Sequence, residues 1–159
     1  MDNYWPVIFI VCAIALAVGP VMMMQPSQRI RRLSALRQAA AQKSIRVRLS
    51  TVTLTSGKKE VAVYSMPLPK TEAVRPKWTL LKQGYTHEAN FDNLWDWENK
   101  KNTAPKGQHA ILRELISSFD ESIIGFEASQ SSVGIYWCEK TLTIDDIESV
   151  LTRSKNALS

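Results

Sequence analysis

Few side chains in this sequence have the types and spacing that catalysis requires. His87-Glu88 begins like a zinc-protease motif, in which two histidines four residues apart hold the metal, but Phe91 stands where the second histidine should be. The run from Thr55 to Lys59 is similar to a phosphate-binding loop, but it lacks the earlier glycine and is followed by a predicted strand instead of a helix. Neither pattern predicts a reaction site.

The other reactive side chains have simpler interpretations. His109 is typical of a residue at a helix boundary, and Asp145 with Asp146 suits the start of a helix better than a carboxylate pair. Cys12 lies in an apolar run and cannot meet Cys138, which we expect to pack as a small apolar residue. We therefore predict no catalytic residue, no cofactor site and no metal site.

Charge is distributed unevenly along the 159 residues, which carry 20 Lys and Arg against 15 Asp and Glu. Residues 1–28 hold one acid and no base, and residues 29–59 hold nine bases and no acid. The remainder, residues 60–159, is weakly acidic. With 45% apolar residues, the composition is that of one modest folded domain with an appendage.

The appendage predicted from this pattern is a membrane anchor. Trp5 to Met24 is a run of 20 uncharged residues, and a helix of that length spans roughly 30 Å, the thickness of a bilayer's hydrocarbon core. The run begins after an acid and is longer than the apolar part of a cleaved signal peptide. We expect residues 1–25 to form a single transmembrane helix.

The bases that follow the anchor predict its orientation. Lys and Arg near a spanning helix stay on the cytoplasmic side, so the N-terminus is expected outside and the C-terminal domain inside the inner membrane of a bacterium. Residues 26–43 are rich in strong helix formers and predict a basic juxtamembrane helix. Its bases are candidates for binding lipid headgroups, although orientation alone would also explain them; these candidates are Arg29, Arg31, Arg32 and Arg37.

Residues 5–50 resemble the YajC-type accessory subunit of the bacterial preprotein translocase. The resemblance rests on Pro26, Gln28, Arg29 and Arg32, which follow the apolar run as a proline-containing basic stretch follows the helix of that family. This chain differs in having Gln25 where the family usually has arginine, in lacking the double-glycine turn, and in continuing much further. The resemblance implies that a translocase or another membrane assembly is the host.

Residues 44–159 predict an α+β domain, expected on the cytoplasmic side. Alternating residues from Ile45 to Leu49 predict a strand whose apolar phase slips near Ser50-Thr51, which indicates a bulge, and residues 60–65 predict its hairpin partner. A helix over residues 108–119, a hairpin over 123–140 and a final helix after Thr143 follow. The order favours a small antiparallel sheet with two or three helices packed on one face.

The segment around residues 91–97 is the best candidate for binding a partner. It mixes large aromatic side chains with acids, and such rings are enriched at binding hot spots; the candidates are Phe91, Leu94, Trp95 and Trp97. Alternatively, the same rings anchor a long loop to the sheet.

Taken together, these patterns predict a non-catalytic, single-pass membrane protein. Its cytoplasmic domain would act as an accessory or protein-binding module, with the bilayer and a membrane or cytoplasmic protein as partners. We expect no nucleic acid partner, because the basic segment has no interleaved aromatic residues, and we identify no small-molecule substrate. The alternative is a membrane-tethered enzyme, which would need a pocket combining His87 or His109 with two or more carboxylates.

Overall fold

The computed structural model describes residues 4–23, 27–55, 57–71 and 74–159, the side chains of residues 17 and 19–23 excepted. The chain divides into two compact units, Met1–Ala35 and Leu36–Ser159. The first unit holds helix α1 (Trp5–Met23) and the beginning of α2 (Gln28–Gln42). The second unit holds the rest of α2 and every strand of the described residues.

Helix α1 forms within the apolar run, but it does not meet the requirements of a membrane span. It has 19 residues, and Met24, the last residue of the predicted run, lies outside the described residues, as do Gln25 and Pro26. Among the helices of the described chain, none is both long enough and apolar enough to cross a bilayer. The predictions of a transmembrane anchor at residues 1–25 and of a single-pass inner-membrane protein with a cytoplasmic domain are therefore wrong.

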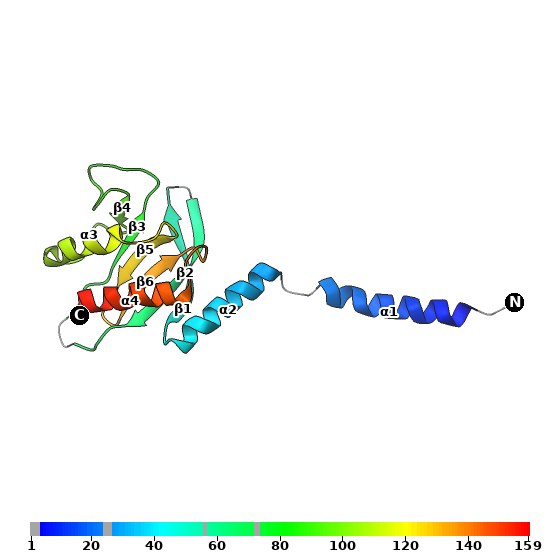
Figure 1. Ribbon diagram of the computed structural model, residues 1–159. Coiled ribbons are helices and arrows are strands. Elements are labelled where there is room, and N and C mark those ends of the chain that lie inside the picture. The colour runs from blue at the N-terminus through cyan, green and yellow to red at the C-terminus, as the bar shows by residue number, and fades with distance from the viewer. Residues whose placement is uncertain (1–3, 24–26, 56, 72–73) are drawn as a thin grey trace. The chain divides into compact units, whose positions relative to one another are not determined.

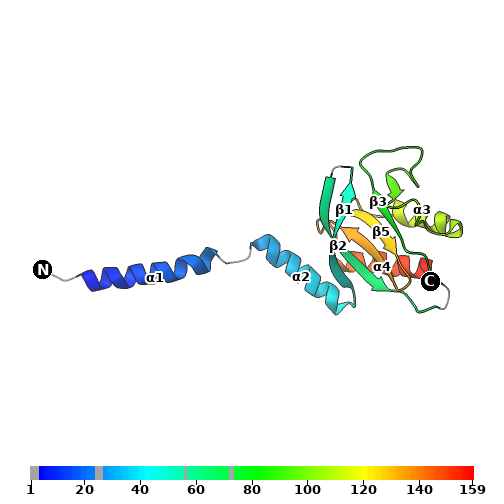
Figure 2. The same ribbon diagram turned by 180° about the vertical axis from the view of Figure 1, so that it is seen from behind.

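The second unit is built on a six-stranded sheet in which every pair of neighbouring strands is antiparallel. Figures 1 and 2 show the sheet from opposite sides. Along the sheet the strand order is β1-β2-β6-β5-β3-β4. The strands are β1 (Arg46–Leu54), β2 (Gly57–Pro67), β3 (Trp78–Lys82), β4 (Trp95–Trp97), β5 (Ile123–Ala128) and β6 (Ser132–Trp137). The predicted α+β class with an antiparallel sheet is confirmed.

Three helices cover one face of this sheet. A short 3₁₀ helix, η1 (Lys106–Gln108), leads into α3 (His109–Ser117), and α4 (Ile144–Leu158) follows β6. Ala40 of α2, Leu112 of α3 and Leu151 of α4 belong to one buried cluster with the sheet's largest side chains, which confirms the predicted one-sided packing. Thr143 caps α4 as predicted, because its hydroxyl accepts a hydrogen bond from the Asp146 N–H and the Asp146 carboxylate accepts one from the Thr143 N–H.

The first hairpin shows why the apolar phase of the sequence slips. The register of β1 with β2 runs without interruption from Arg46 opposite Ser65 to Leu54 opposite Gly57, so the predicted bulge near Ser50-Thr51 is wrong. Val47 instead packs against the helix-covered core, and Val52 belongs to a second cluster on the other face. The strand changes its buried face midway because a different core lies beneath each half.

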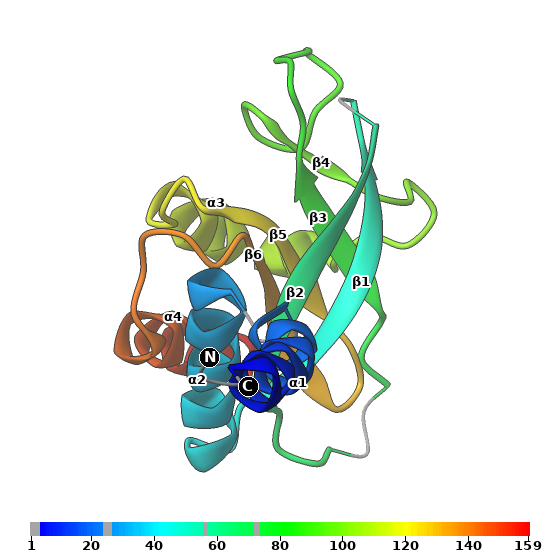
Figure 3. The ribbon, with the colours of Figure 1, turned by 90° about the vertical axis from the view of Figure 1, so that its right-hand side faces the viewer.

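The second cluster lies on the sheet face opposite the helices. Among the described residues it contains side chains of strands only, namely Val52, Val61, Val63, Leu81 and Tyr136. At the tip of the β1–β2 hairpin the Thr55 hydroxyl donates a 3.2 Å hydrogen bond to Gln83 Oε1, at the end of β3. Figure 3 shows the hairpin tip at the same end of the sheet as the loop that follows β3. This face is therefore covered by the β1–β2 hairpin, which is itself part of the sheet.

Candidate functional site

Both histidines support local structure. His87 Nδ1 accepts a 3.0 Å hydrogen bond from the N–H of Ala89, within its own turn. The ring of His109 lies with Nε2 3.0 Å from the Ala104 carbonyl oxygen and packs against Phe91. Within the part of the chain that the structure describes, no three His, Cys, Asp or Glu side chains gather as a metal site would require. Neither histidine lines any of the hollows between described residues that are considered below.

The aromatic segment before α3 packs onto the sheet. Trp95, on β4, is only 6% exposed, and its ring centroid lies 6.0 Å from that of Phe119. Trp97 is half-buried, with ring centroids 5.7 Å from Trp78 and 4.8 Å from Phe91 in edge-to-face arrangements. Leu94 is also half-buried. These contacts favour the alternative interpretation, in which the rings hold a long loop against the sheet.

Among the candidate headgroup ligands, Arg37 differs from the others. Its Nε and Nη2 donate to the two oxygens of Glu139 at 2.9 and 3.0 Å, and the Tyr64 hydroxyl donates to the same carboxylate at 2.8 Å. The hydrogen bond to Glu139 raises the pKa of Arg37, and burial raises the pKa of Tyr64. Arg29, Arg31 and Arg32 are exposed on the earlier turns of α2. Arg37 is thus committed to the fold of the second unit.

The end of α2 is fixed to α4 by a second group of charges. Lys43 Nζ contacts Asp145 Oδ1 at 2.7 Å and also forms an ion pair with Glu148. Leu36, Ala39 and Ala40 supply the apolar contacts of the same segment with the helix-covered core. The second half of α2 is therefore one wall of the folded domain.

A partly exposed polar cluster joins β1 to β5 and β6 on the other face of the sheet. Arg48 Nη2 donates to both oxygens of Glu127 at 2.8 Å, and the Tyr136 hydroxyl donates to Glu127 Oε2 at 2.6 Å. The Arg48 guanidinium lies 5.9 Å from the centroid of the Tyr136 ring. That ring lies against Gly125, where an added Cβ would come within 2.7 Å of it. The cluster pairs its own charges and links β1 to β5 and β6.

Beyond this cluster, β1 is the last strand on its side of the sheet. Within the described chain it pairs with β2 alone, so its other edge carries backbone N–H and C=O groups that no strand meets. Leu49 is 54% exposed on this strand. A hollow of about 270 Å³ lies between β1 and α2. It is lined by Arg37, Ala41, Ile45, Val47, Arg48 and Leu49.

A second hollow, of about 240 Å³, adjoins the start of β1. Arg46 and Lys70 line it together with Ser65, Ser131 and Ser132. Both bases are exposed, and neither forms an ion pair with any residue that the structure describes. The edge of β1 therefore combines a hollow lined mainly by apolar side chains, with Arg37 and Arg48 beside them, and two bases that form no ion pair with the described residues.

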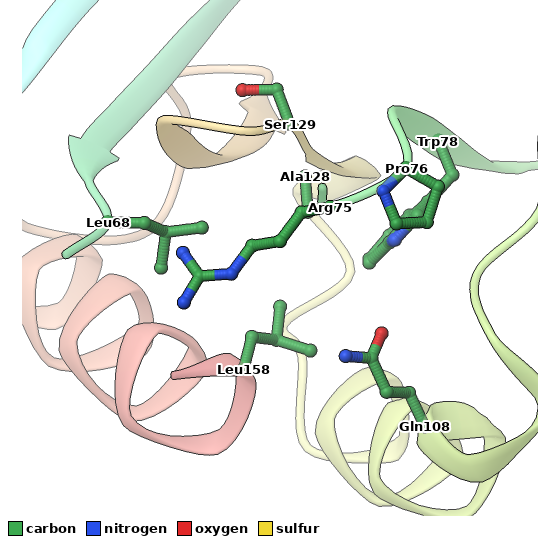
Figure 4. Close-up of a pocket in the computed structure, with 8 residues that line it drawn as sticks. All are labelled: Leu68, Arg75, Pro76, Trp78, Gln108, Ala128, Ser129 and Leu158. Carbon is green, nitrogen blue, oxygen red and sulfur yellow. The ribbon is translucent and has the colours of Figure 1, made fainter. Parts of the chain in front are cut away.

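A third hollow is too small to bind a ligand. This hollow, shown in Figure 4 between Leu68, Trp78 and Leu158, has a volume of about 20 Å³ and is entered by the Arg75 side chain. The Arg75 guanidinium donates a 3.1 Å hydrogen bond to the Pro69 carbonyl oxygen. A volume of this size accommodates about one water molecule, so this site is packing between a loop and the ends of two helices.

Comparisons with known proteins identify no relative, because no family model, no curated protein and no solved structure matches the chain. The resemblance of residues 5–50 to the YajC-type subunit accordingly remains an observation on the sequence. The sequence predicted the strand that contains Leu49, but it did not indicate that this strand lies at the edge of the sheet, where a partner could bind. The position of a strand in a sheet depends on the order of all the strands, which only the topology reveals.

Proposed function

We propose that this protein is a non-catalytic accessory module that binds another protein, with the outer edge of β1 as its docking surface. The observation that supports this proposal is the exposed edge of β1 beside the apolar hollow under α2. A sheet edge offers a row of hydrogen-bonding groups to an extended chain, and adjoining pockets then select the side chains of that chain.

The length and fixation of β1 suit it to this role. With nine residues it is longer than the typical strand of five or six, so its outer edge presents several unpaired N–H and C=O groups. Natural proteins usually shorten or cover such an edge to prevent aggregation. The cluster of Arg48, Glu127 and Tyr136 holds β1 in place before any partner arrives, which reduces the entropy that binding must overcome.

Site-specific photo-crosslinking in cells tests the proposal. A photoreactive amino acid replaces Leu49 in the full chain, and a second protein carries the same group at Ile111, which is 39% exposed on α3. We expect a discrete protein adduct from position 49 and none of the same size from position 111. Equal adducts from both positions, or no adduct from position 49, would contradict docking at β1.

A further inference from the structure

We infer that the segment bound at β1 is an extended chain in which acidic and apolar side chains alternate. This inference rests on the proposed function and adds the chemistry of the partner. It follows from the different characters of the two faces that meet at the β1 edge.

The register of β1 determines which side chains lie on each face. Val47 and Leu49 are opposite Tyr64 and Ala62, two residues of the helix-covered core. Arg46 and Arg48 are opposite Ser65 and Val63, on the other face. Successive side chains of an added strand also alternate between these two faces. Every second side chain of the partner would therefore enter the apolar hollow beside α2, and the others would lie beside the arginines.

The charges on the arginine face favour carboxylates. Arg48 is held by Glu127, whereas Arg46 and Lys70 form no ion pair with any residue in the described ranges. The β1–β2 hairpin, residues 46–67, carries four bases and one acid. Opposite charges on neighbouring strands stabilise their pairing, so acids on this face of the partner would be attracted and bases repelled.

The same charges disfavour a second copy of this protein as the occupant. Pairing β1 with β1 of another molecule would bring arginines of both copies onto one face of the joined sheet. Like charges that face each other across paired strands destabilise the pairing. Basic side chains are a common protection of edge strands against such self-association. The occupant we infer is therefore a different chain, acidic where this one is basic.

Nucleic acid fits this edge less well than an acidic peptide. A phosphate backbone would satisfy the bases of the hairpin, but it has no apolar groups for the part of the hollow that Ala41, Val47 and Leu49 line. It also has no N–H and C=O groups spaced to pair with a strand. An alternating peptide uses the backbone, the hollow and the charges together.

Peptide binding to the purified full chain tests the inference. Fluorescent peptides of about nine residues, long enough to pair with all of β1, are compared by anisotropy: alternating Glu and Val, alternating Lys and Val, and Glu and Val in two blocks. We expect the alternating acidic peptide to bind at least about tenfold more tightly than either control, and to weaken as salt is raised. Equal binding of the Lys and Glu peptides, or tighter binding of single-stranded DNA of equal charge, would overturn the inference.

Matched variants locate the interaction. Arg46→Glu should remove the preference for the acidic peptide, whereas Lys101→Glu, the same charge change at an exposed turn, should preserve it. Leu49→Glu should lower the affinity for every peptide that binds the unchanged protein. Circular dichroism and urea unfolding show whether each variant remains folded, and a variant that unfolds is replaced by the milder Arg46→Gln or Leu49→Ser.

Amide hydrogen exchange separates this inference from the proposed function. If only the acidic peptide slows the exchange of the β1 amides, both the docking at β1 and the acidic partner are supported. Slowed exchange with the acidic and basic peptides alike overturns the acidic partner and leaves docking at β1 in place. No protection of β1 by any peptide, together with no crosslink from position 49, overturns both.

Discussion

Arg37 and Glu139, 102 residues apart in the chain, form a two-point ion pair that joins α2 to the turn after β6. The Glu139 side chain is only 10% exposed, and its backbone has a φ of 55°, in the left-handed region that residues other than glycine rarely adopt. Tyr64 donates a third hydrogen bond to the same carboxylate. Three donors thus keep a strained, nearly buried acid in position.

Replacing Arg37 should destabilise the domain. We expect Arg37→Ala to lower the free energy of unfolding by about 1–2 kcal/mol, because a two-point charged hydrogen bond is lost and Glu139 keeps only Tyr64. Arg31→Ala, on an exposed turn of the same helix, is the control and should change the value by less than about 0.5 kcal/mol. Urea unfolding measures both, and equal effects would mean that the ion pair contributes nothing.

Stability should decline at high pH because of two buried tyrosines. Burial raises the pKa of Tyr64 and of Tyr136 above the usual value, and each donates to a carboxylate. The unfolded chain then loses these phenolic protons above pH about 10 while the folded chain retains them. Stability from these groups is therefore complete below pH 10 and is lost as the pH rises further.

Urea unfolding between pH 8 and 11.5 measures this decline. Tyr64→Phe should make it shallower without abolishing it, because Tyr136 remains. Lys43, whose pKa is raised by its hydrogen bonds to Asp145 and Glu148, contributes in the same direction. An unchanged slope in Tyr64→Phe would contradict the buried, protonated state of Tyr64.

Gly125 should not tolerate a side chain. An alanine Cβ there would lie 2.7 Å from the Tyr136 ring and 2.9 Å from Leu81, so we expect Gly125→Ala to cost about 1–3 kcal/mol through overpacking. Gly107, in η1, has no described residue other than its chain neighbours within 4 Å of the position its Cβ would take, and Gly107→Ala should be nearly neutral. Thermal unfolding of the two variants provides the comparison, and a neutral Gly125→Ala would show that the Tyr136 ring can move aside.

The aromatic segment is expected to affect stability more than partner binding. Trp95→Ala should lower the free energy of unfolding by about 3–5 kcal/mol, because a nearly buried ring is lost from the contact with Phe119. Tyr85→Ala, at a half-exposed position in the same loop, should have a small effect. If Trp95→Ala instead left the melting temperature unchanged and abolished partner capture, the segment would be a binding surface after all.

Local sequence patterns correctly predicted those helices whose formation depends on residues close together in the chain. The spacing of Leu112, Leu115 and Ile116 predicted α3. Thr143, followed by two acids in the first helical turn, predicted the start of α4. These signals depend on residues within a few positions of one another. They were sufficient for the fold class and for the helix-covered face.

Long-range relationships could not be predicted in this way. Arg48 and Glu127 are 79 residues apart, and nothing near either residue indicates its partner. Between Leu49 and Val52 the apolar residues change from odd to even positions. The same change in the sequence is expected for a bulged strand and for a regular strand that passes from one core to another. The apolar run from Trp5 shows a related limit, since counting residues predicted a membrane span that the described helix does not satisfy.

The compact unit Leu36–Ser159 begins in the middle of α2, so a cut at its border divides a helix. A fragment starting at residue 44 would discard Arg37 and Lys43 and leave the carboxylates of Glu139 and Glu148 without their cations. A fragment starting at Ser27 would keep the helix intact, with the Ser27 hydroxyl accepting a hydrogen bond from the Ile30 N–H. Recombinant expression of the domain should therefore begin at that serine.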